Sequence, residues 1–181
     1  MSEIIKVLEQ EYNKKSNRLD KVYMNIAKEV ATLSYCVRSQ VGAILVKDGN
    51  IISMGYNGTP KGFDNCCEDT YELDDKSLVW VSKEEQVQMN IFEKDGKQYG
   101  LKTKPEVLHA EMNAVLKAAK TGNAVQDSTL YITLMPCLDC AKYLLQSGIK
   151  RVVYLNEYRD TKGVELLKQY IKVDQFTNEV F

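Results

Sequence analysis

Two cysteines with helical spacing are the first sign of chemistry in this sequence. Cys137 and Cys140 lie three residues apart, directly after Pro136, a residue that favours the first turn of a helix. Positions i and i+3 share one face of a helix, so both thiols should point the same way. A helix N-terminus also favours the thiolate form that binds metals. The pair therefore indicates half of a zinc site.

His109, the one histidine in the chain, offers a third ligand. A single histidine excludes H-E-x-x-H proteases, three-histidine zinc sites and two-histidine iron sites. A His/Cys/Cys set leaves the fourth position of zinc open for water, as catalytic sites require. Glu111 follows His109 by two residues, about 200° around an ideal helix. We expect its carboxylate beside the metal, where it can move protons.

Three other interpretations of these residues stay open. A structural zinc site would need a fourth protein ligand, which Cys36, Cys66 or Cys67 could supply. A thioredoxin-like redox site would place its C-x-x-C near the start of a βαβ unit and would not need the histidine. A catalytically silent, zinc-stabilised binding domain would have no use for an unligated carboxylate at Glu111.

The length and composition favour an ordinary globular protein. The chain has 181 residues, of which 44% are hydrophobic and 27% charged, and its formal net charge is -1. This balance gives no reason to expect a nucleic-acid partner. No stretch approaches 18 consecutive apolar residues and the first residues do not resemble a signal peptide, so we expect no membrane association. Five cysteines with a C-x-x-C spacing favour a reducing compartment, and therefore a cytoplasmic location.

Helices and strands that alternate along the chain are expected to position the two motifs. The periodicity and turn residues predict a helix from Asp20 to about Cys36, strands Val41–Val46 and Ile51–Tyr56 joined by a turn at Asp48–Asn50, a helix from about His109 to Ala119, a strand Thr129–Leu134, a helix Cys137–Gln146, a strand Arg151–Leu155, and a helix Val164–Tyr170 with a short strand after it.

This order of elements predicts an α/β fold. A hairpin followed by helix–strand–helix–strand favours a mixed sheet of about five strands with helices on both faces, which is a three-layer α/β/α sandwich. We expect a single domain over residues 1–181. An N-terminal helical arm at 1–19 and an insertion at about 64–105, with some local structure but no clear period, would elaborate it.

Several motifs together resemble the zinc-dependent cytidine/deoxycytidylate deaminase superfamily and, within it, the dCMP deaminases. The similarity runs from about Ala31 to Leu155. The motifs H-x-E and P-C-x-x-C are the pattern of zinc nucleobase deaminases in general. The motifs that carry the resemblance are Ser34–Ala43, Gly55–Pro60, His109–Ala114, Pro136–Cys140 and Gln146–Lys150, of which Gly55–Pro60 is similar to dCMP deaminases in particular.

The resemblance implies a cytidine deaminase-like fold and the hydrolytic deamination of dCMP to dUMP and ammonia, in the biosynthesis of dTTP precursors. It implies zinc held by His109, Cys137 and Cys140. Glu111 would take a proton from the attacking water, deliver it to ring N3 and then help protonate the departing amine. A deaminase of tRNA adenosine or of a free nucleoside remains the alternative within the same superfamily.

The resemblance also implies roles for residues outside the two motifs. The substrate-binding residues would be Asn57 at the deoxyribose, the Ala110 N–H at the base carbonyl, and Arg38, Ser39, Tyr158 and Arg159 as candidates for the phosphate. Arg38 and Arg159 could equally be solvated surface charges.

Regulation and assembly are implied in the same way. Many similar enzymes are homohexamers, activated by dCTP with Mg²⁺ and inhibited by dTTP. Their nucleotide loop corresponds here to Gly55, Tyr56, Asn57 and Gly58. Some relatives bind a second, structural zinc, for which Cys36, Cys66 and Cys67 would be the ligands. The insertion has no histidine, however, which argues against that second site.

Overall fold

A mixed sheet of five strands forms the centre of the molecule. The computed structural model describes residues 18–73 and 91–177. The strand order is β2-β1-β6-β7-β8. β1 pairs antiparallel with β2 and β6, whereas β6, β7 and β8 run parallel to one another. The strands are β1 (Gly42–Lys47), β2 (Asn50–Tyr56), β6 (Thr129–Leu134), β7 (Arg151–Asn156) and β8 (Lys172–Gln175).

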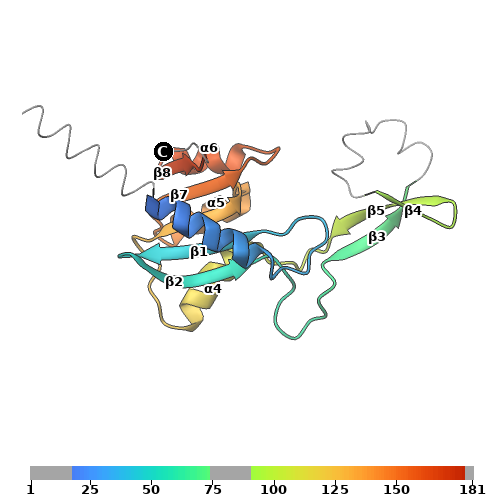
Figure 1. The fold of residues 1–181 in the computed structure, drawn as a ribbon, viewed down its shortest axis with the longest axis horizontal. Coiled ribbons are helices and arrows are strands. Elements are labelled where there is room, and N and C mark those ends of the chain that lie inside the picture. The colour runs from blue at the N-terminus through green and yellow to red at the C-terminus, as the bar shows by residue number, and fades with distance from the viewer. Residues whose placement is uncertain (1–17, 74–90, 178–181) are drawn as a thin grey trace, which may run out of the picture.

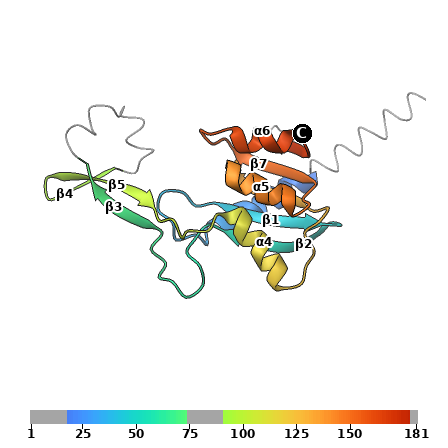
Figure 2. The same cartoon turned by 180° about the vertical axis from the view of Figure 1, so that it is seen from behind.

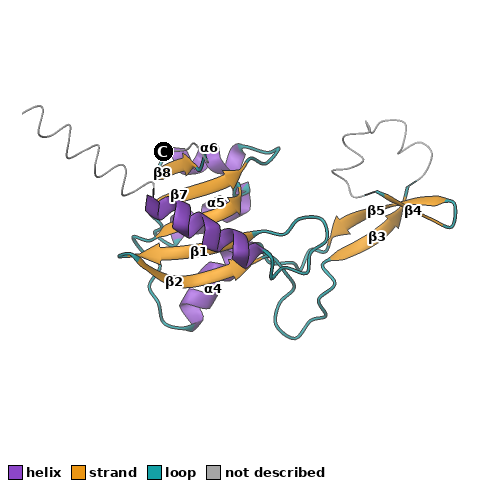
Figure 3. Ribbon diagram, in the orientation of Figure 1, coloured by secondary structure: helices purple, strands orange, loops and turns teal. Residues whose placement is uncertain are grey.

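Helices cover both faces of this sheet (Figures 1–3). A helix over residues 18–31 lies on one face. On the other face lie α4 (Ala110–Lys120), α5 (Leu138–Gln146) and α6 (Lys162–Lys168). The predicted three-layer α/β/α sandwich is therefore confirmed. None of the helices in the described part of the chain has the length and apolar character of a membrane span.

Alternation along the strands divides the core into two layers. In β1, Ala43 and Leu45 belong to the cluster that packs against α4, α5 and α6. Ile44 and Val46 belong to the cluster beneath the helix over residues 18–31, together with Met24 of that helix. Side chains of a strand point alternately to its two faces, so one buried strand supplies both layers.

The β1–β2 hairpin forms through a tight turn at Asp48 and Gly49. Both residues have positive φ angles, 50° and 77°, as the two-residue hairpin turn requires. The pairing starts at Lys47↔Asn50 and carries on to Gly42↔Tyr56. The hairpin predicted from the sequence is confirmed, and its second strand begins one residue earlier than expected.

The first helix ends earlier than its hydrophobic period indicated. The helix stops at residue 31 rather than near Cys36. Leu33, which continued the apolar pattern, is 51% exposed. The Ser34 hydroxyl instead accepts a hydrogen bond from the Cys36 N–H and donates one to the Asn57 carbonyl. Local side-chain bonding to the backbone thus replaces the last helical turn.

A small antiparallel sheet occupies the region that the sequence marked as an insertion. It consists of β3 (Glu68–Glu72), β4 (Phe92–Lys94) and β5 (Lys97–Thr103), in the order β3-β5-β4. Figure 1 shows this sheet projecting away from the larger one. The arm expected at residues 1–19 lies almost wholly outside the described residues, as does the middle of the insertion, residues 74–90.

Candidate active site

His109 lies at the start of α4. His109 is the N-cap of this helix, with an extended backbone at φ -72° and ψ 155°. The residue before it, Leu108, exchanges two backbone hydrogen bonds with Gly58, at N–O distances of 2.9 and 3.1 Å. The loop after β2 therefore determines how the chain enters α4.

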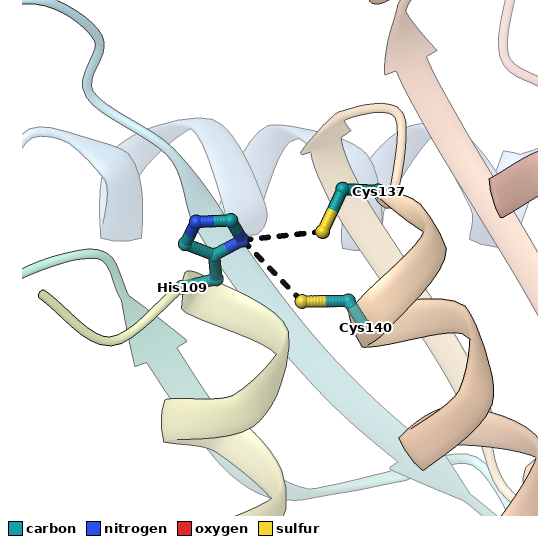
Figure 4. A group of neighbouring side chains, drawn as sticks. All are labelled: His109, Cys137 and Cys140. Atoms are coloured by element: carbon teal, nitrogen blue, oxygen red, sulfur yellow. Dashed lines mark hydrogen bonds between the residues drawn. The ribbon is translucent and has the colours of Figure 1, made fainter. Parts of the chain in front are cut away.

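The start of α5 places both cysteines opposite His109. Cys137 is the N-cap of α5 and Cys140 lies in its first turn. The His109 Nδ1 is 3.6 Å from the Cys137 sulfur and 3.4 Å from the Cys140 sulfur (Figure 4). The three ligand atoms all lie within 4.8 Å of one another. Over residues 18–73 and 91–177, this is the one cluster of three such side chains with the geometry of a metal site.

The donors in this cluster fit zinc. One imidazole nitrogen and two sulfurs suit zinc, and three protein ligands are the number found in catalytic zinc sites. A hydrogen bond from Cys140, and then the neighbouring His109, lower the pKa of Cys137 to about 4. The same hydrogen bond and burial raise the pKa of Cys140. One thiolate is thus already favoured, and a bound cation would favour the second.

Glu111 is buried beside the three candidate ligands. Its side chain sits in the first turn of α4 with a relative exposure of 4%. Burial raises the pKa of its carboxyl from 4.5 to about 7, and this effect outweighs the opposing influence of its own backbone N–H and of His109. Cys137 raises and a hydrogen bond with Cys140 lowers the pKa of this carboxyl, so it lies close to both sulfurs. A buried carboxyl that titrates near neutrality is suited to moving protons.

Asn57 holds the loop before β1. Its Oδ1 accepts from the Val41 N–H at 2.8 Å, and its Nδ2 donates to the Ser39 carbonyl at 2.8 Å. Ser39 thus contributes a backbone group to this bond, whereas the sequence suggested a side-chain role at the phosphate. The amide of Asn57 is already engaged in fixing residues 39–41, so any contact with a ligand would use its remaining donor or lone pair.

Asn113 also ties the loop after β2 to α4, and sequence reasoning missed it. The Asn113 Nδ2 donates to the Tyr56 carbonyl at 2.7 Å. The signal available in the sequence was an asparagine inside a helix, where its propensity is low. The segment Gly55–Gly58 therefore contacts the helix that begins at His109 through both Gly58 and Tyr56.

The candidate phosphate residues fall into two places. The Arg38 guanidinium donates to the Thr103 hydroxyl at 2.9 Å, so Arg38 contacts the end of β5. Arg159 lies 5.8 Å from the centre of the Tyr158 ring, and both residues are exposed after β7. The Tyr158 N–H contacts the Met135 sulfur, two residues before Cys137.

The cysteines suggested as ligands of a second zinc have a different arrangement. Cys36 and Cys67 form a disulfide, and both are buried beside Val107. The Cys66 thiol is free and exposed, and it contacts the Glu68 carbonyl. Since two of the three sulfurs are bonded to each other, these cysteines do not form a metal-ligand set, and the suggested second zinc site is not what the structure shows.

Comparison with known proteins agrees with this site. The sequence profile of the cytidine and deoxycytidylate deaminase zinc-binding region matches residues 17–156. The chain belongs to this deaminase family. Deoxycytidylate deaminase of Enterobacteria phage T4 is 38% identical over 151 residues, which cover 77% of this chain and 78% of the phage protein. The phage T2 enzyme of the same name is 36% identical over 153 residues, covering 77% of this chain and 80% of that protein.

A solved structure in the family is also similar to this deaminase. The dCMP deaminase of cyanophage S-TIM5, in complex with dCMP and dUMP, superimposes with a TM-score of 0.67 at 38% sequence identity. The match covers 88% of this chain and 97% of the cyanophage chain. Because the agreement extends over nearly the whole cyanophage chain, this deaminase has the cytidine deaminase-like fold that the resemblance implied.

Proposed function

We propose that this deaminase converts dCMP and water into dUMP and ammonia. The observation that carries the proposal is the His/Cys/Cys cluster with a buried carboxyl beside it, at the meeting point of two helix N-termini. Two relatives of about this length are named deoxycytidylate deaminase, and a similar structure holds dCMP and dUMP. These similarities favour the nucleotide over tRNA or a free nucleoside as the substrate.

In this proposal His109, Cys137 and Cys140 would hold zinc, and Glu111 would move the protons. Bound zinc supplies a water molecule whose pKa is lowered towards neutrality. The Glu111 carboxylate accepts a proton from the attacking water. Its raised pKa lets it return that proton to N3 of the cytosine ring, and then assist protonation of the amine that leaves C4 as ammonia.

Other residues of the chain would bind and orient the nucleotide. Ala110 lies in the first turn of α4, where backbone N–H groups have no partner within the helix, so its N–H can donate to the base carbonyl. Asn57 would contact the deoxyribose with the donor left over from its bond to Ser39. Arg159 with Tyr158, and Arg38 with the Ser39 hydroxyl, remain the candidates for the phosphate.

The same proposal includes regulation, because the loop Gly55–Gly58 contacts the helix that starts at His109. We propose that dCTP with Mg²⁺ activates the enzyme and that dTTP inhibits it, both at this loop. A nucleotide bound there would act through the Gly58–Leu108 and Tyr56–Asn113 hydrogen bonds. We further propose a homohexamer that works in the biosynthesis of dTTP precursors. The cytoplasmic location expected from the sequence assumed reduced cysteines, and the Cys36–Cys67 disulfide removes that argument for it.

The experiment that tests the proposed function compares four substrates in one preparation. Ammonia release is measured from dCMP, dCTP, deoxycytidine and tRNA, and bound zinc is quantified in the same sample. We expect release from dCMP at the highest kcat/KM, with about one zinc per chain in this site. Release from tRNA or deoxycytidine in preference to dCMP would contradict the proposed substrate, and a zinc-free active enzyme would contradict the mechanism.

A further inference from the structure

A glycine in α6 lies directly against the backbone that carries one candidate zinc ligand. Gly163 is buried in the first turn of this helix. A Cβ placed on Gly163 would lie 2.6 Å from the carbonyl carbon of Cys137 and 2.7 Å from its carbonyl oxygen, and closer still to the carbonyl oxygen of Pro136. Real Cβ atoms essentially never approach other atoms this closely. The first turn of α6 therefore packs on the Pro136–Cys137 peptide at a distance that a hydrogen atom permits and a methyl group does not.

The surroundings give this segment little room to move away. The Met135 N–H donates to the Asn156 carbonyl at 2.9 Å, which attaches the segment to the end of β7. Pro136 is itself fully buried. Behind Gly163, Val164 and Leu167 pack into the core that also contains Ala141 of α5. The peptide before α5 is therefore enclosed between β7 and α6.

A similar contact lies behind the other helix of the site. A Cβ on Gly55 would lie 3.0 Å from the Cα of Ala114, and closer to the Ala110 carbonyl oxygen and the Ala114 nitrogen. Ala110 is the residue directly after His109. The first turn of α4 therefore packs against a glycine of β2, and the start of α5 packs against a glycine of α6.

We propose that Gly163 is a positioning residue for zinc, because it sets the place of the Cys137 backbone relative to His109 and Cys140. This inference rests on the proposed function. A methyl group at this position would force the first turn of α6 and the Pro136–Cys137 segment apart by more than a few tenths of an ångström. Ligand distances at a zinc site hold to within about 0.2 Å. The added methyl group should therefore weaken zinc binding specifically, beyond any loss of stability.

The test is Gly163→Ala, with Val164→Ala as its matched control in the same helix turn. Val164 is 3% exposed and faces the core, so its truncation destabilises the fold by leaving a cavity and adds nothing next to Cys137. Zinc affinity is measured by competition with a chromophoric chelator. The visible spectrum of the Co²⁺-loaded protein reports the ligand geometry, and urea unfolding of the zinc-free proteins reports stability.

We expect Gly163→Ala to bind zinc about 10- to 100-fold more weakly, the range seen when groups that orient ligands are altered. Its Co²⁺ spectrum should differ from that of wild type. Val164→Ala should unfold at lower urea while keeping the wild-type zinc affinity and Co²⁺ spectrum. Unchanged zinc binding by Gly163→Ala, or an equal loss in both variants, would overturn the inference. A wild-type protein that binds no zinc would overturn the proposed function as well.

A second pair of variants asks the same question if Gly163→Ala does not fold. Gly55→Ala places a methyl group against α4, and Gly42→Ala places one against the backbone of Ala27 and Ala31 in the first helix, which holds no candidate ligand. Weaker zinc binding in Gly55→Ala than in Gly42→Ala would support positioning by glycine contacts. Equal zinc affinity in these two variants would overturn it.

Discussion

Glu111 is deeply buried, although its proposed role is to exchange protons. Its carboxyl is held at the start of α4 beside two sulfurs, and burial makes its charged form costly. The sequence predicted that this residue should stand beside the metal and not on it, from its angular separation from His109. What the sequence could not supply was the burial, because that depends on elements that pack over α4 from elsewhere in the chain.

The first prediction concerns Glu111→Gln. The amide keeps the size of the side chain but cannot accept the proton of the attacking water, so kcat for dCMP should fall by about 10²- to 10⁴-fold. Zinc content should remain near wild type because the residue is not one of the three ligands. The control is Asp139→Asn in the first turn of α5, an exposed carboxylate that pairs with Lys142. A Glu111→Gln enzyme with normal turnover would contradict the mechanism.

The second prediction concerns pH and the zinc-free protein. The folded state raises the pKa of Glu111 from 4.5 to about 7, so it holds a proton that the unfolded state releases between these pH values. The free energy of unfolding should therefore fall as pH rises through this window. Between these two pH values, the free energy of unfolding of wild type should fall by about 3 kcal/mol relative to that of Glu111→Gln, because each unit of pKa shift corresponds to 1.36 kcal/mol.

Urea unfolding of both zinc-free proteins between about pH 4 and pH 8 measures this difference. Cys137 and His109 are present in both proteins, so the comparison isolates the titration of Glu111 together with its coupling to these two groups. If the difference between the two proteins stays constant across this range, the burial of Glu111 does not have the electrostatic effect described.

The third prediction compares zinc binding after substitution of Cys137, a proposed ligand, and of the exposed Cys66. Cys137→Ser replaces a thiolate with a hydroxyl that is a poor zinc ligand, so zinc should be lost or bound at least about 10-fold more weakly. Cys66→Ser alters a free thiol outside the cluster and should leave zinc content unchanged. Metal analysis after dialysis against a chelator measures both. Full zinc occupancy in Cys137→Ser would show that the ligand assignment is wrong.

At the scale of helices and strands, the sequence predicted those elements that have a clear local pattern. The hairpin, the strand Thr129–Leu134 and the helices at the two motifs agree with the structure, because each has a strong period or a turn signal. The small sheet β3-β5-β4 was not predicted strand by strand. β3 and β4 are largely exposed and β5 is mostly half-buried, and none of the three shows the regular alternation of buried and exposed residues that reveals a strand in a sequence.

The disulfide was also beyond the sequence, because five cysteines allow many pairings. Cys36 follows the first helix and Cys67 precedes β3, so only the fold brings them together. The Arg38 N–H donates to the Glu68 carboxylate at 3.2 Å, which holds these two segments side by side. The expectation of reduced cysteines, drawn from their number and the C-x-x-C spacing, is therefore wrong at these two positions.

The fourth prediction follows from this bond. Cys36 and Cys67 are 31 residues apart, and closing a loop of that length restricts the unfolded chain enough to contribute about 3 to 4 kcal/mol. Reduction of the purified, zinc-loaded protein should lower its free energy of unfolding by about that amount. Alkylation under denaturing, zinc-free and non-reducing conditions should modify Cys66, Cys137 and Cys140 alone.

The matched control for the fourth prediction is Cys66→Ser, whose stability should respond to reduction as wild type does. Cys36→Ser should already be destabilised and should not respond further. Five modified thiols in the oxidised protein would show that the bond does not form.

At the scale of the whole molecule, the backbone contacts of Gly58 connect the hairpin half of the chain to the part that follows the insertion. Its bridge to Leu108 joins the segment after β2 to the entry of α4, across the long insertion between them. A nucleotide that moves this segment when it binds would therefore also move the start of α4, next to His109. This is the physical basis for expecting regulation at the loop.

The fifth prediction concerns that regulation. We expect the rate to depend sigmoidally on dCMP, with dCTP and Mg²⁺ lowering the half-saturating concentration by about tenfold and dTTP raising it, within the usual range of coupling between sites. Initial rates over a dCMP series with each nucleotide test this, and light scattering of the same samples gives the assembly. A hyperbolic curve that responds to neither nucleotide would contradict the proposed regulation.

The projecting sheet leaves the body and returns to it at almost the same point. The Lys104 N–H donates to the Cys67 carbonyl at 2.9 Å, and β3 and β5 pair from Glu68↔Thr103 outwards. β3 and β5 therefore form a two-stranded stem, and the length of the module that they carry can change without altering the spacing between the elements of the main sheet. We expect that evolution, or an engineer grafting a binding loop or a fluorescent tag, can exchange that module while His109, Cys137 and Cys140 keep their positions.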